Sequence, residues 1–361
     1  MLHVLALPHT QTTRAYDSCA YTSKVRKFAT MMTRQGYDVV LYGGEDNEAE
    51  CAEFVPCITR AEQAGLLSGY EWFQRGEFYG VPYNDSEPVW AVYLARVIDE
   101  LSERISERDI ICLSSGTQKP VMDAFSAHLT VETGVGYEGT CAPHRVFESY
   151  AWMHTVYGAQ QGATAADGHF FDAVIPNFFE PEDFPLGADP EPYCLFMSRM
   201  TPRKGYEIAI EATRRAGVVL KIAGAGGDRP AAHHVEYVGL ADPIKRAELM
   251  GNATALLAPT HYLEPFGGVV VEAAMCGTPA ITTDWGAFSE TVEDGLSGYR
   301  CRTLREFVDA IEATPQLDRV AIHKRAVETY SLAAIGPQYD RHFKRLQSLW
   351  GQGFYEMEDT C

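Results

Sequence analysis

Basic residues are scarce in this 361-residue chain. Lys and Arg number 30 against 49 Asp and Glu, which gives a formal net charge of −19 at pH 7. A strongly acidic chain repels polyphosphates at long range. Extended nucleic-acid binding is therefore disfavoured, although a local basic cleft is compatible with this charge.

Long apolar runs are also missing. Among the longest is Gly267 to Cys276, and even this run is interrupted by Glu272, so it is far below the ~20 residues that a bilayer-spanning helix needs. The opening MLHVLALPHT has no basic region and reaches Pro8 early. It therefore predicts a first strand and not a signal peptide.

The cysteines form no metal-binding or disulfide pattern. There are 9 of them, an odd number, without a CxxC pair or a Cys/His cluster. This usage is typical of free thiols in a reducing compartment. We therefore expect a cytoplasmic protein without structural zinc.

The first half alternates apolar runs with stretches of helical spacing. Strands are predicted at 4–7, 39–42, 110–113, 129–132 and 173–175, and helices at 21–34, 89–106, 119–126 and 145–157. This rhythm favours a parallel sheet covered by helices. The segment 45–84 is less regular, and we expect its aromatic residues Tyr70, Trp72, Phe73, Phe78 and Tyr79 to form satellite core.

A proline-rich stretch interrupts this rhythm, which then restarts. Prolines stand at 176, 181, 185, 190 and 192, and proline interrupts regular elements. Beyond it, strands are predicted at 193–197, 218–223, 235–238, 255–258 and 280–283, and helices at 204–216, 243–251, 268–275, 303–313, 317–330 and 337–350. No internal repeat accompanies the shared rhythm.

The fold class predicted is therefore α/β, with two Rossmann-like, doubly wound parallel-sheet domains and a ligand cleft between them. We expect an N-terminal domain at 1–180, a linker at 181–192, a C-terminal domain at 193–335 and a terminal segment at 336–361. Gly336-Pro337 predicts a break before the last helix. Ligands of open parallel sheets bind beyond the carboxyl ends of the strands.

Two loops of the second domain carry candidate anion-binding groups. Arg199 and Lys204 follow the strand at 193–197 and precede a helix. Helix N-termini attract anions, and cations strengthen that attraction. A solvated basic turn is an equal alternative. Gly224 and Gly226 follow the next strand, but Arg229 stands where a dinucleotide fingerprint needs a small residue, so that signal is weak.

The segment EPFGGVVVEAA gives the strongest signal. Gly267 and Gly268 open a predicted helix, and small residues there let a phosphate or sugar approach its N–H groups. Glu264 precedes this helix and Glu272 lies one turn inside it, so both carboxylates can border one pocket. Compensation of the helix dipole is the alternative for one carboxylate, but is less suited to a pair.

The run EPFGGVVVEAAMCGTPAI strongly resembles the E-x7-E motif of retaining glycosyltransferases of family 4, which have the two-domain GT-B fold. FMSRMTPRKG resembles the phosphate-binding segment of that family. TDWGAFSETVEDGLSGY resembles its segment GG-x-x-E-x-V-x-x-G-x-x-G. In the first half, HT…CAYTSKVRKFA and RVFESYAWMH resemble, more loosely, glycosyltransferase-like proteins of phages and environmental bacteria.

The resemblance implies a hexosyltransferase-like enzyme that uses a nucleotide-sugar. Arg199 and Lys204 would hold the donor diphosphate, and Glu264 would orient the donor sugar. Glu272 would bind the ribose. Backbone N–H groups of Phe266, Gly267 and Gly268 would reach the sugar or phosphate, with Gly224 and Gly226 also on the donor side. It implies no cofactor and no metal, in keeping with the lack of a DxD motif. On family frequency a UDP-sugar is favoured over a GDP-sugar.

The acceptor side departs from the family pattern. The first strand–helix loop has no Gly-Gly pair, and Thr10 lies there instead. The usual His at a strand end is replaced by Glu132, with His144 and His154 as further candidates. A lone His on a helix is more often structural. The acceptor stays open among a glycan, a lipid carrier, a small molecule and a modified nucleic-acid base.

Two other functions remain open on sequence grounds. One is a sugar-nucleotide epimerase or phosphorylase of the same fold, against which the E-x7-E layout argues. The other is a non-catalytic nucleotide-sugar binding protein. We also expect the amphipathic C-terminal helix to cross back and pack on the first domain.

Overall fold

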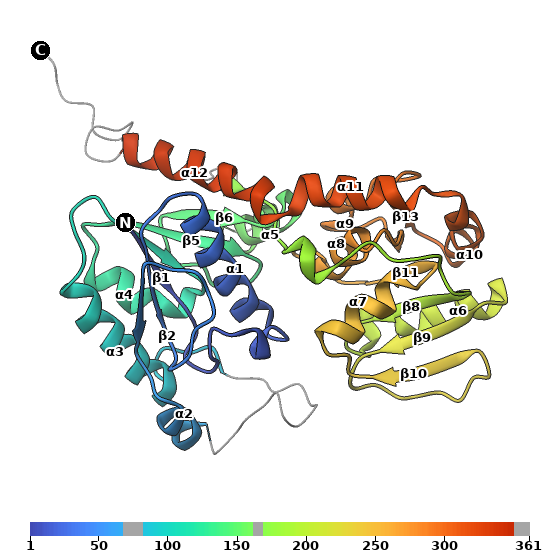
Figure 1. Cartoon of the computed structure of the whole chain (residues 1–361), viewed down its shortest axis with the longest axis horizontal. Helices are drawn as coiled ribbons and strands as arrows, with labels where there is room; N and C mark the ends of the chain where they lie inside the picture. The colour runs from blue at the N-terminus through green and yellow to red at the C-terminus, as the bar shows by residue number, and fades with distance from the viewer. Residues whose placement is uncertain (68–81, 162–168, 350–361) are drawn as a thin grey trace, which may run out of the picture. The chain divides into compact units, whose positions relative to one another are not determined.

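The computed structural model describes residues 1–67, 82–161 and 169–349 (Figure 1). The chain forms two compact units. The first comprises Met1–Glu148, Val156–Phe178 and Ile335–Cys361, and the second comprises Ser149–Thr155 and Phe179–Ala334. The aromatic group predicted as satellite core at 70–79 lies outside the described residues.

The first unit contains a seven-stranded parallel sheet. Its spatial order is β3 (Glu53–Pro56), β2 (Val39–Gly43), β1 (Leu2–Leu5), β4 (Ile110–Leu113), β5 (Leu129–Val135), β6 (His144–Phe147) and β7 (Ala173–Val174). β1, β2, β4 and β5 are buried along their whole length, as expected of parallel strands covered on both faces. The strand order reverses direction between β1 and β4.

Helices cover both faces of this sheet (Figure 1). Their bounds are α1 (Ala20–Arg34), α2 (Arg60–Leu66), α3 (Pro88–Ser102), α4 (Lys119–Ala124) and α5 (Tyr150–Gln161), joined by α12 (Leu332–Leu349). On one face Trp90 and Tyr93 of α3 pack with Tyr42 and Ile111. The core of this unit is therefore aromatic as well as aliphatic.

α12 packs on α1 of the first unit. The ring of Tyr339 lies edge-on to Phe28, with centroids 5.1 Å apart, and Phe343 contacts the same ring at 6.4 Å. The hydroxyl of Tyr37 donates to Asp340 at 2.9 Å. α12 runs unbroken through Pro337, so the predicted break there was wrong. Proline removes one N–H from the ladder, and the buried aromatic side chains of α12 hold the helix across that gap.

The second unit contains a six-stranded parallel sheet. Its order is β10 (Val235–Gly239), β9 (Val219–Ala223), β8 (Tyr193–Met197), β11 (Ala255–Ala258), β12 (Ala280–Thr283) and β13 (Gly298–Cys301). Its helices are α6 (Tyr206–Ala216), α7 (Pro243–Gly251), α8 (Gly268–Met275), α9 (Phe288–Thr291), α10 (Leu304–Ala313) and α11 (Arg319–Tyr330). The order reverses between β8 and β11.

Alternate strand residues face two separate cores in this unit. Leu195 and Leu256 pack with α7 and α8, whereas Phe196 and Leu257 pack with α6 and α10. This is the period-2 alternation of a strand buried on both faces. The strands at 193–197, 255–258 and 280–283 and the helices at 243–251 and 268–275 have the predicted bounds.

The predicted helix at 145–157 in the first half of the chain was wrong in its first part, which is a strand. The stretch 145–157 was expected to be one helix, but it holds the end of β6 followed by α5. Arg145 is 2% exposed within the sheet because Asp172 neutralises it at 2.7 Å. A buried arginine in a strand has no local signature. The strands β3 and β13 and the helix α2 were not predicted.

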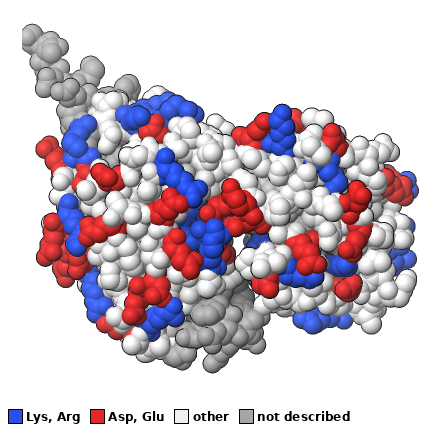
Figure 2. Space-filling view, in the orientation of Figure 1, with Lys and Arg blue, Asp and Glu red and all other residues white. Residues whose placement is uncertain are grey.

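Charge is distributed without a dominant sign on the visible face. Figure 2 shows Lys and Arg interspersed with Asp and Glu over both units. Among residues 1–67, 82–161 and 169–349, no helix combines the length and apolar character needed to span a bilayer.

Candidate functional site

The loops after β8 and β11 meet at the switch point of the second sheet. The first loop contains Arg199 to Gly205, and the second contains Pro259 to Gly267. The His261 N–H donates to the Arg203 carbonyl at 2.8 Å and ties the loops together. Such a switch point is where open parallel sheets bind ligands.

Lys204, Tyr262 and Glu264 form a compact polar cluster at this point. The Lys204 ammonium is ion-paired with the Glu264 carboxylate. It also donates to the Tyr262 hydroxyl at 2.8 Å, and that hydroxyl donates to the second Glu264 oxygen at 2.7 Å. The side chains of Lys204 and Glu264 are only 16% and 10% exposed. The sequence motif named Lys204 and Glu264 but missed Tyr262, which lies within the same segment.

Tyr262 also carries a cation on its ring. The Arg203 guanidinium lies 4.0 Å from the ring centroid, a distance typical of cation–π contact. Burial, followed by the negative charge of Glu264, raises the pKa of Tyr262 well above its usual range. The hydroxyl therefore stays protonated and acts as a fixed donor to Glu264.

Replacing Tyr262 by phenylalanine should remove this donor and keep the ring. A hydrogen bond to a charged group is worth about 1.5–3 kcal/mol, so we expect kcat/KM of a reaction that uses Glu264 to fall about tenfold or more. The matched control is Tyr237→Phe, whose hydroxyl donates at 3.0 Å to the neutral Pro230 carbonyl. Equal kinetics of the two variants would contradict a role for the Tyr262 hydroxyl.

The N-terminus of α8 borders the same loop. Gly267 caps the helix at φ +79°, and a Cβ there would overlap the Phe288 ring, so glycine is required. Phe266 is buried and stacks on Phe179 at 6.3 Å, which fixes where the helix begins. The N–H groups of a first helical turn lack intrahelical partners, so this terminus offers donors to an anion or a sugar.

Glu272 is buried on α8 and is ion-paired with Arg246 of α7. The sequence named Glu272 but missed Arg246, because 26 residues separate them and no spacing rule relates the two helices. The guanidinium holds the carboxylate in place and neutralises it. A second pair of opposite charges therefore accompanies the Lys204–Glu264 pair.

The remaining donor-side candidates lie in two touching loops. Arg199 is exposed in the loop after β8, and its charge lowers the pKa of Tyr262, though less than burial raises it. Gly224 and Gly226 lie after β9. The Met200 N–H donates to the Ala225 carbonyl at 2.9 Å and joins these loops.

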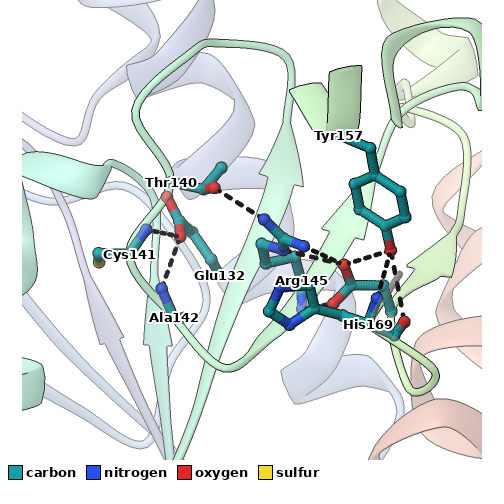
Figure 3. A network of polar contacts seen from close by, with 8 residues as sticks. Glu132, Thr140, Cys141, Ala142, Arg145, Tyr157 and His169 are labelled. Atoms are coloured by element: carbon teal, nitrogen blue, oxygen red, sulfur yellow. Dashed lines mark hydrogen bonds and ion pairs between the residues drawn. The ribbon is translucent and has the colours of Figure 1, made fainter. Parts of the chain in front are cut away.

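Glu132, an acceptor-side candidate, is fully buried in β5 of the first unit. Its carboxylate accepts from the backbone N–H groups of Cys141 and Ala142 at 2.8 and 3.0 Å (Figure 3). It also accepts from the Tyr137 hydroxyl at 2.7 Å. Burial raises its pKa, against the opposing effect of these donors. These contacts anchor the 137–142 loop.

The other acceptor-side candidates lie apart from Glu132 in the chain. Thr10 is buried and shares a 2.6 Å hydrogen bond with Thr22. His144 opens β6, where burial lowers its pKa, and His154 is exposed on α5. Figure 3 also shows Arg145 bonded to Thr140, with Tyr157 nearby. Arg145 and Tyr157 both donate to the Asp172 carboxylate, at 2.9 and 2.8 Å.

Comparison with known proteins agrees with the two-unit fold. The glycosyltransferase AviGT4 of avilamycin A biosynthesis covers 96% of this chain and 98% of its own, with a TM-score of 0.69 at 17% identity. Anabaena HepE, solved with UDP and glucose, covers 95% and 99%, with a TM-score of 0.64 at 15% identity. The fold is the GT-B fold, with two Rossmann-like parallel-sheet units.

Sequence similarity concentrates in the second unit. Residues 179–314 match the family model described as Glycosyl transferases group 1. The Mycobacterium tuberculosis glycogen synthase is 36% identical over 122 residues, which cover 30% of this chain and 29% of that protein. The Gordonia bronchialis D-inositol 3-phosphate glycosyltransferase is 29% identical over 197 residues, 46% and 43% of the two chains. The chain thus spans less than half the length of these curated relatives.

Proposed function

We propose that this protein is a retaining glycosyltransferase that moves a sugar from a nucleoside-diphosphate-sugar to an acceptor hydroxyl. The observation that carries the proposal is the Lys204–Tyr262–Glu264 cluster beside the N-terminus of α8. The group 1 glycosyltransferase match over residues 179–314 supports the same reaction class.

The chemistry assigned to the cluster is stabilisation of the leaving group. Transfer breaks the bond between the sugar C1 and the diphosphate oxygen, and negative charge grows on that oxygen. Lys204, Arg199 and the α8 N–H groups are the donors we assign to the diphosphate, since preorganised positive groups stabilise such charge. We propose on this basis that no metal is needed.

The two carboxylates are assigned different tasks. Glu264 is ion-paired with Lys204 and accepts from Tyr262, which makes it a weak nucleophile and a well-oriented acceptor for donor-sugar hydroxyls. Glu272, held by Arg246, is assigned to the ribose. Attack by the acceptor hydroxyl on the face that the diphosphate leaves would retain the anomeric configuration, through an oxocarbenium-like transition state. The hydroxyl proton would pass to the departing diphosphate oxygen.

The donor is proposed to be a UDP-sugar. The neighbour of similar fold solved with UDP and glucose favours uridine over guanosine. Melting temperature measured with UDP- and GDP-sugars checks this, because a ligand bound only by the native state stabilises it. A larger increase in melting temperature with GDP-sugars would reverse the assignment.

NMR of the product, which reports its anomeric configuration, tests whether the reaction retains the configuration of the donor.

Glu272→Ala and Glu264→Ala test the division of labour. We expect Glu272→Ala to raise KM for the donor with little change in kcat, because the ribose contact is made equally in ground and transition states. Glu264→Ala should lower kcat, because orienting the sugar matters most in the transition state. An effect confined to KM in both variants would show that both residues only bind donor.

The same assay separates the two alternatives. Recovery of an epimerised sugar-nucleotide would indicate an epimerase. Tight donor binding without transfer to any acceptor or to water would indicate a binding protein. Transfer, or slow hydrolysis of the donor, supports the glycosyltransferase.

A further inference from the structure

A cavity lies at the switch point of the first unit's sheet. It has a volume of about 620 Å³, within the range of ~300–1,000 Å³ typical of small-molecule sites. Loops that follow the carboxyl ends of β4 and β5 line it, together with the start of α1 and residues 83–85. This is the sheet edge at which ligands of such folds bind.

Three tyrosines form one wall of this cavity. The Tyr21 ring lies 5.6 Å from Tyr83 and 5.7 Å from Tyr137 between centroids. The Tyr137 hydroxyl is held by Glu132 at 2.7 Å, so its ring is fixed. Tyr83 is 43% exposed and offers open aromatic surface. Flat aromatic surface suits the apolar C–H face of a sugar ring.

The polar lining consists of hydroxyls and carboxylates. Ser115 and Thr117 contribute hydroxyls after β4, while Asp85 and Glu138 contribute exposed carboxylates. Neither Lys nor Arg is among the described residues that line the cavity. Carboxylates accept hydrogen bonds from sugar hydroxyls but repel a phosphate.

The cations beside the cavity are already paired. Lys24 lies 5.4 Å from the Tyr21 ring centroid, but it is ion-paired with Glu148 and donates to the Gly134 carbonyl at 2.8 Å. Lys119 is ion-paired with Asp123 at 2.6 Å. Each of these two ammonium groups therefore has a carboxylate partner outside the cavity lining.

The cavity floor is built by close backbone packing. A Cβ on Gly116 would overlap the Gly139 carbonyl oxygen, so the two loops approach each other only because residue 116 is glycine. The buried Glu132 carboxylate holds the second loop through Cys141 and Ala142. The lining loops are therefore held in a fixed shape before any ligand arrives.

We infer that this cavity binds the acceptor of the proposed transfer, and that the acceptor presents a neutral sugar ring without phosphate. The identification of this ligand as the acceptor rests on the proposed function. The chemistry of the site stands by itself: three tyrosines for the ring face, hydroxyls and carboxylates for the ring hydroxyls, and two negative charges that exclude phosphate.

Saturation-transfer NMR on the full chain tests this inference without turnover. The probes are methyl α-glucoside and methyl α-mannoside as neutral sugars, and glucose 6-phosphate as the anionic one. We expect the neutral glycosides to bind at least about tenfold more tightly than glucose 6-phosphate, because the two carboxylates repel the phosphate. A tenfold ratio of dissociation constants corresponds to ~1.4 kcal/mol. Equal or tighter binding of glucose 6-phosphate, or binding of none of the three, overturns the inference.

Three variants locate the binding. Tyr83→Ala should abolish the glycoside signal, whereas Phe170→Ala, at an aromatic residue that is 76% exposed and outside the cavity lining, should leave it unchanged. The double variant Asp85→Lys/Glu138→Lys should gain binding of glucose 6-phosphate. Unchanged glycoside binding in Tyr83→Ala, or no gain in the charge-reversed variant, also overturns the inference.

Donor binding in the same samples tests the proposed function separately. A nucleotide-sugar that raises the melting temperature of wild type and of Tyr83→Ala equally supports the donor site, whatever the glycosides do. If the glycosides bind and no nucleotide-sugar does, the cavity is a sugar site and the glycosyltransferase proposal fails.

Discussion

Replacing Lys204 by alanine should lower kcat/KM for the nucleotide-sugar by about 30- to 1,000-fold. The loss corresponds to ~2–4 kcal/mol, the range for a charged contact to a developing oxyanion. Lys204 is part-buried, and its ammonium is ion-paired with Glu264 and donates to the Tyr262 hydroxyl, so its charge lies within the polar cluster. Steady-state kinetics measure the effect, and Arg199→Ala should change kcat/KM in the same direction. Near-wild-type kinetics in both variants would rule out the assignment of Lys204 and Arg199 to the donor diphosphate.

A double variant separates two explanations of that loss. If Lys204 only neutralises Glu264, then Lys204→Ala/Glu264→Ala should be no more impaired than Glu264→Ala. If Lys204 binds the diphosphate, the double variant should be more impaired than Glu264→Ala. The matched control is Lys245→Ala, another lysine paired with a glutamate, Glu248, at 3.0 Å but exposed on α7. It should leave kinetics unchanged.

Deleting the chain from Gly336 onward should abolish transfer. The deletion removes three side chains of α12 that are almost fully buried in the first unit: Tyr339, Phe343 and Leu346, at 1%, 0% and 2% exposure. Their loss removes two ring partners of Phe28 in α1, Tyr339 and Phe343, and exposes an apolar surface. Calorimetry should show loss of the first unit's transition, while donor binding through the second unit persists weakly. A truncated protein with full activity would refute this.

A single substitution in α12 tests the packing of this helix on the first unit without removing the helix. Phe343→Ala should lower the free energy of unfolding of the first unit by about 3–5 kcal/mol, since removing a buried phenylalanine costs both transfer energy and a cavity. Phe170→Ala removes a ring that is 76% exposed. It should change the free energy of unfolding of the first unit by less than about 0.5 kcal/mol. Urea denaturation measures both. Equal changes would contradict the packing of α12.

The second unit was predictable in detail because its signals are local. The strands β8 and β11 are continuous apolar runs, as expected of parallel strands buried on both faces. α8 begins after the Gly-Gly pair, where Gly267 takes a positive φ that other residues avoid. Lys204 and Glu264 could be named because loops after neighbouring parallel strands end at one sheet edge.

The misses have a common physical origin in contacts between distant residues. Arg145 sits in a strand because Asp172 neutralises it, and local spacing carries no sign of that partner. Pro337 lies within α12 because tertiary packing of Tyr339 and Phe343 offsets the lost hydrogen bond. Glu132 was predicted at a strand end, but β5 continues to Val135, and the amides of the following loop engage the Glu132 carboxylate.

The sequence by itself determined the α/β class of the fold and its division into two strand–helix series, since periodicity encodes these, and it named Lys204 and Glu264 as candidate site residues. The tertiary structure alone decided the partners: Arg246 for Glu272, Tyr262 between Lys204 and Glu264, and three tyrosines around one cavity. Such partners depend on how whole elements pack, and packing is set by side-chain shape and charge across the fold and not by neighbours in the chain.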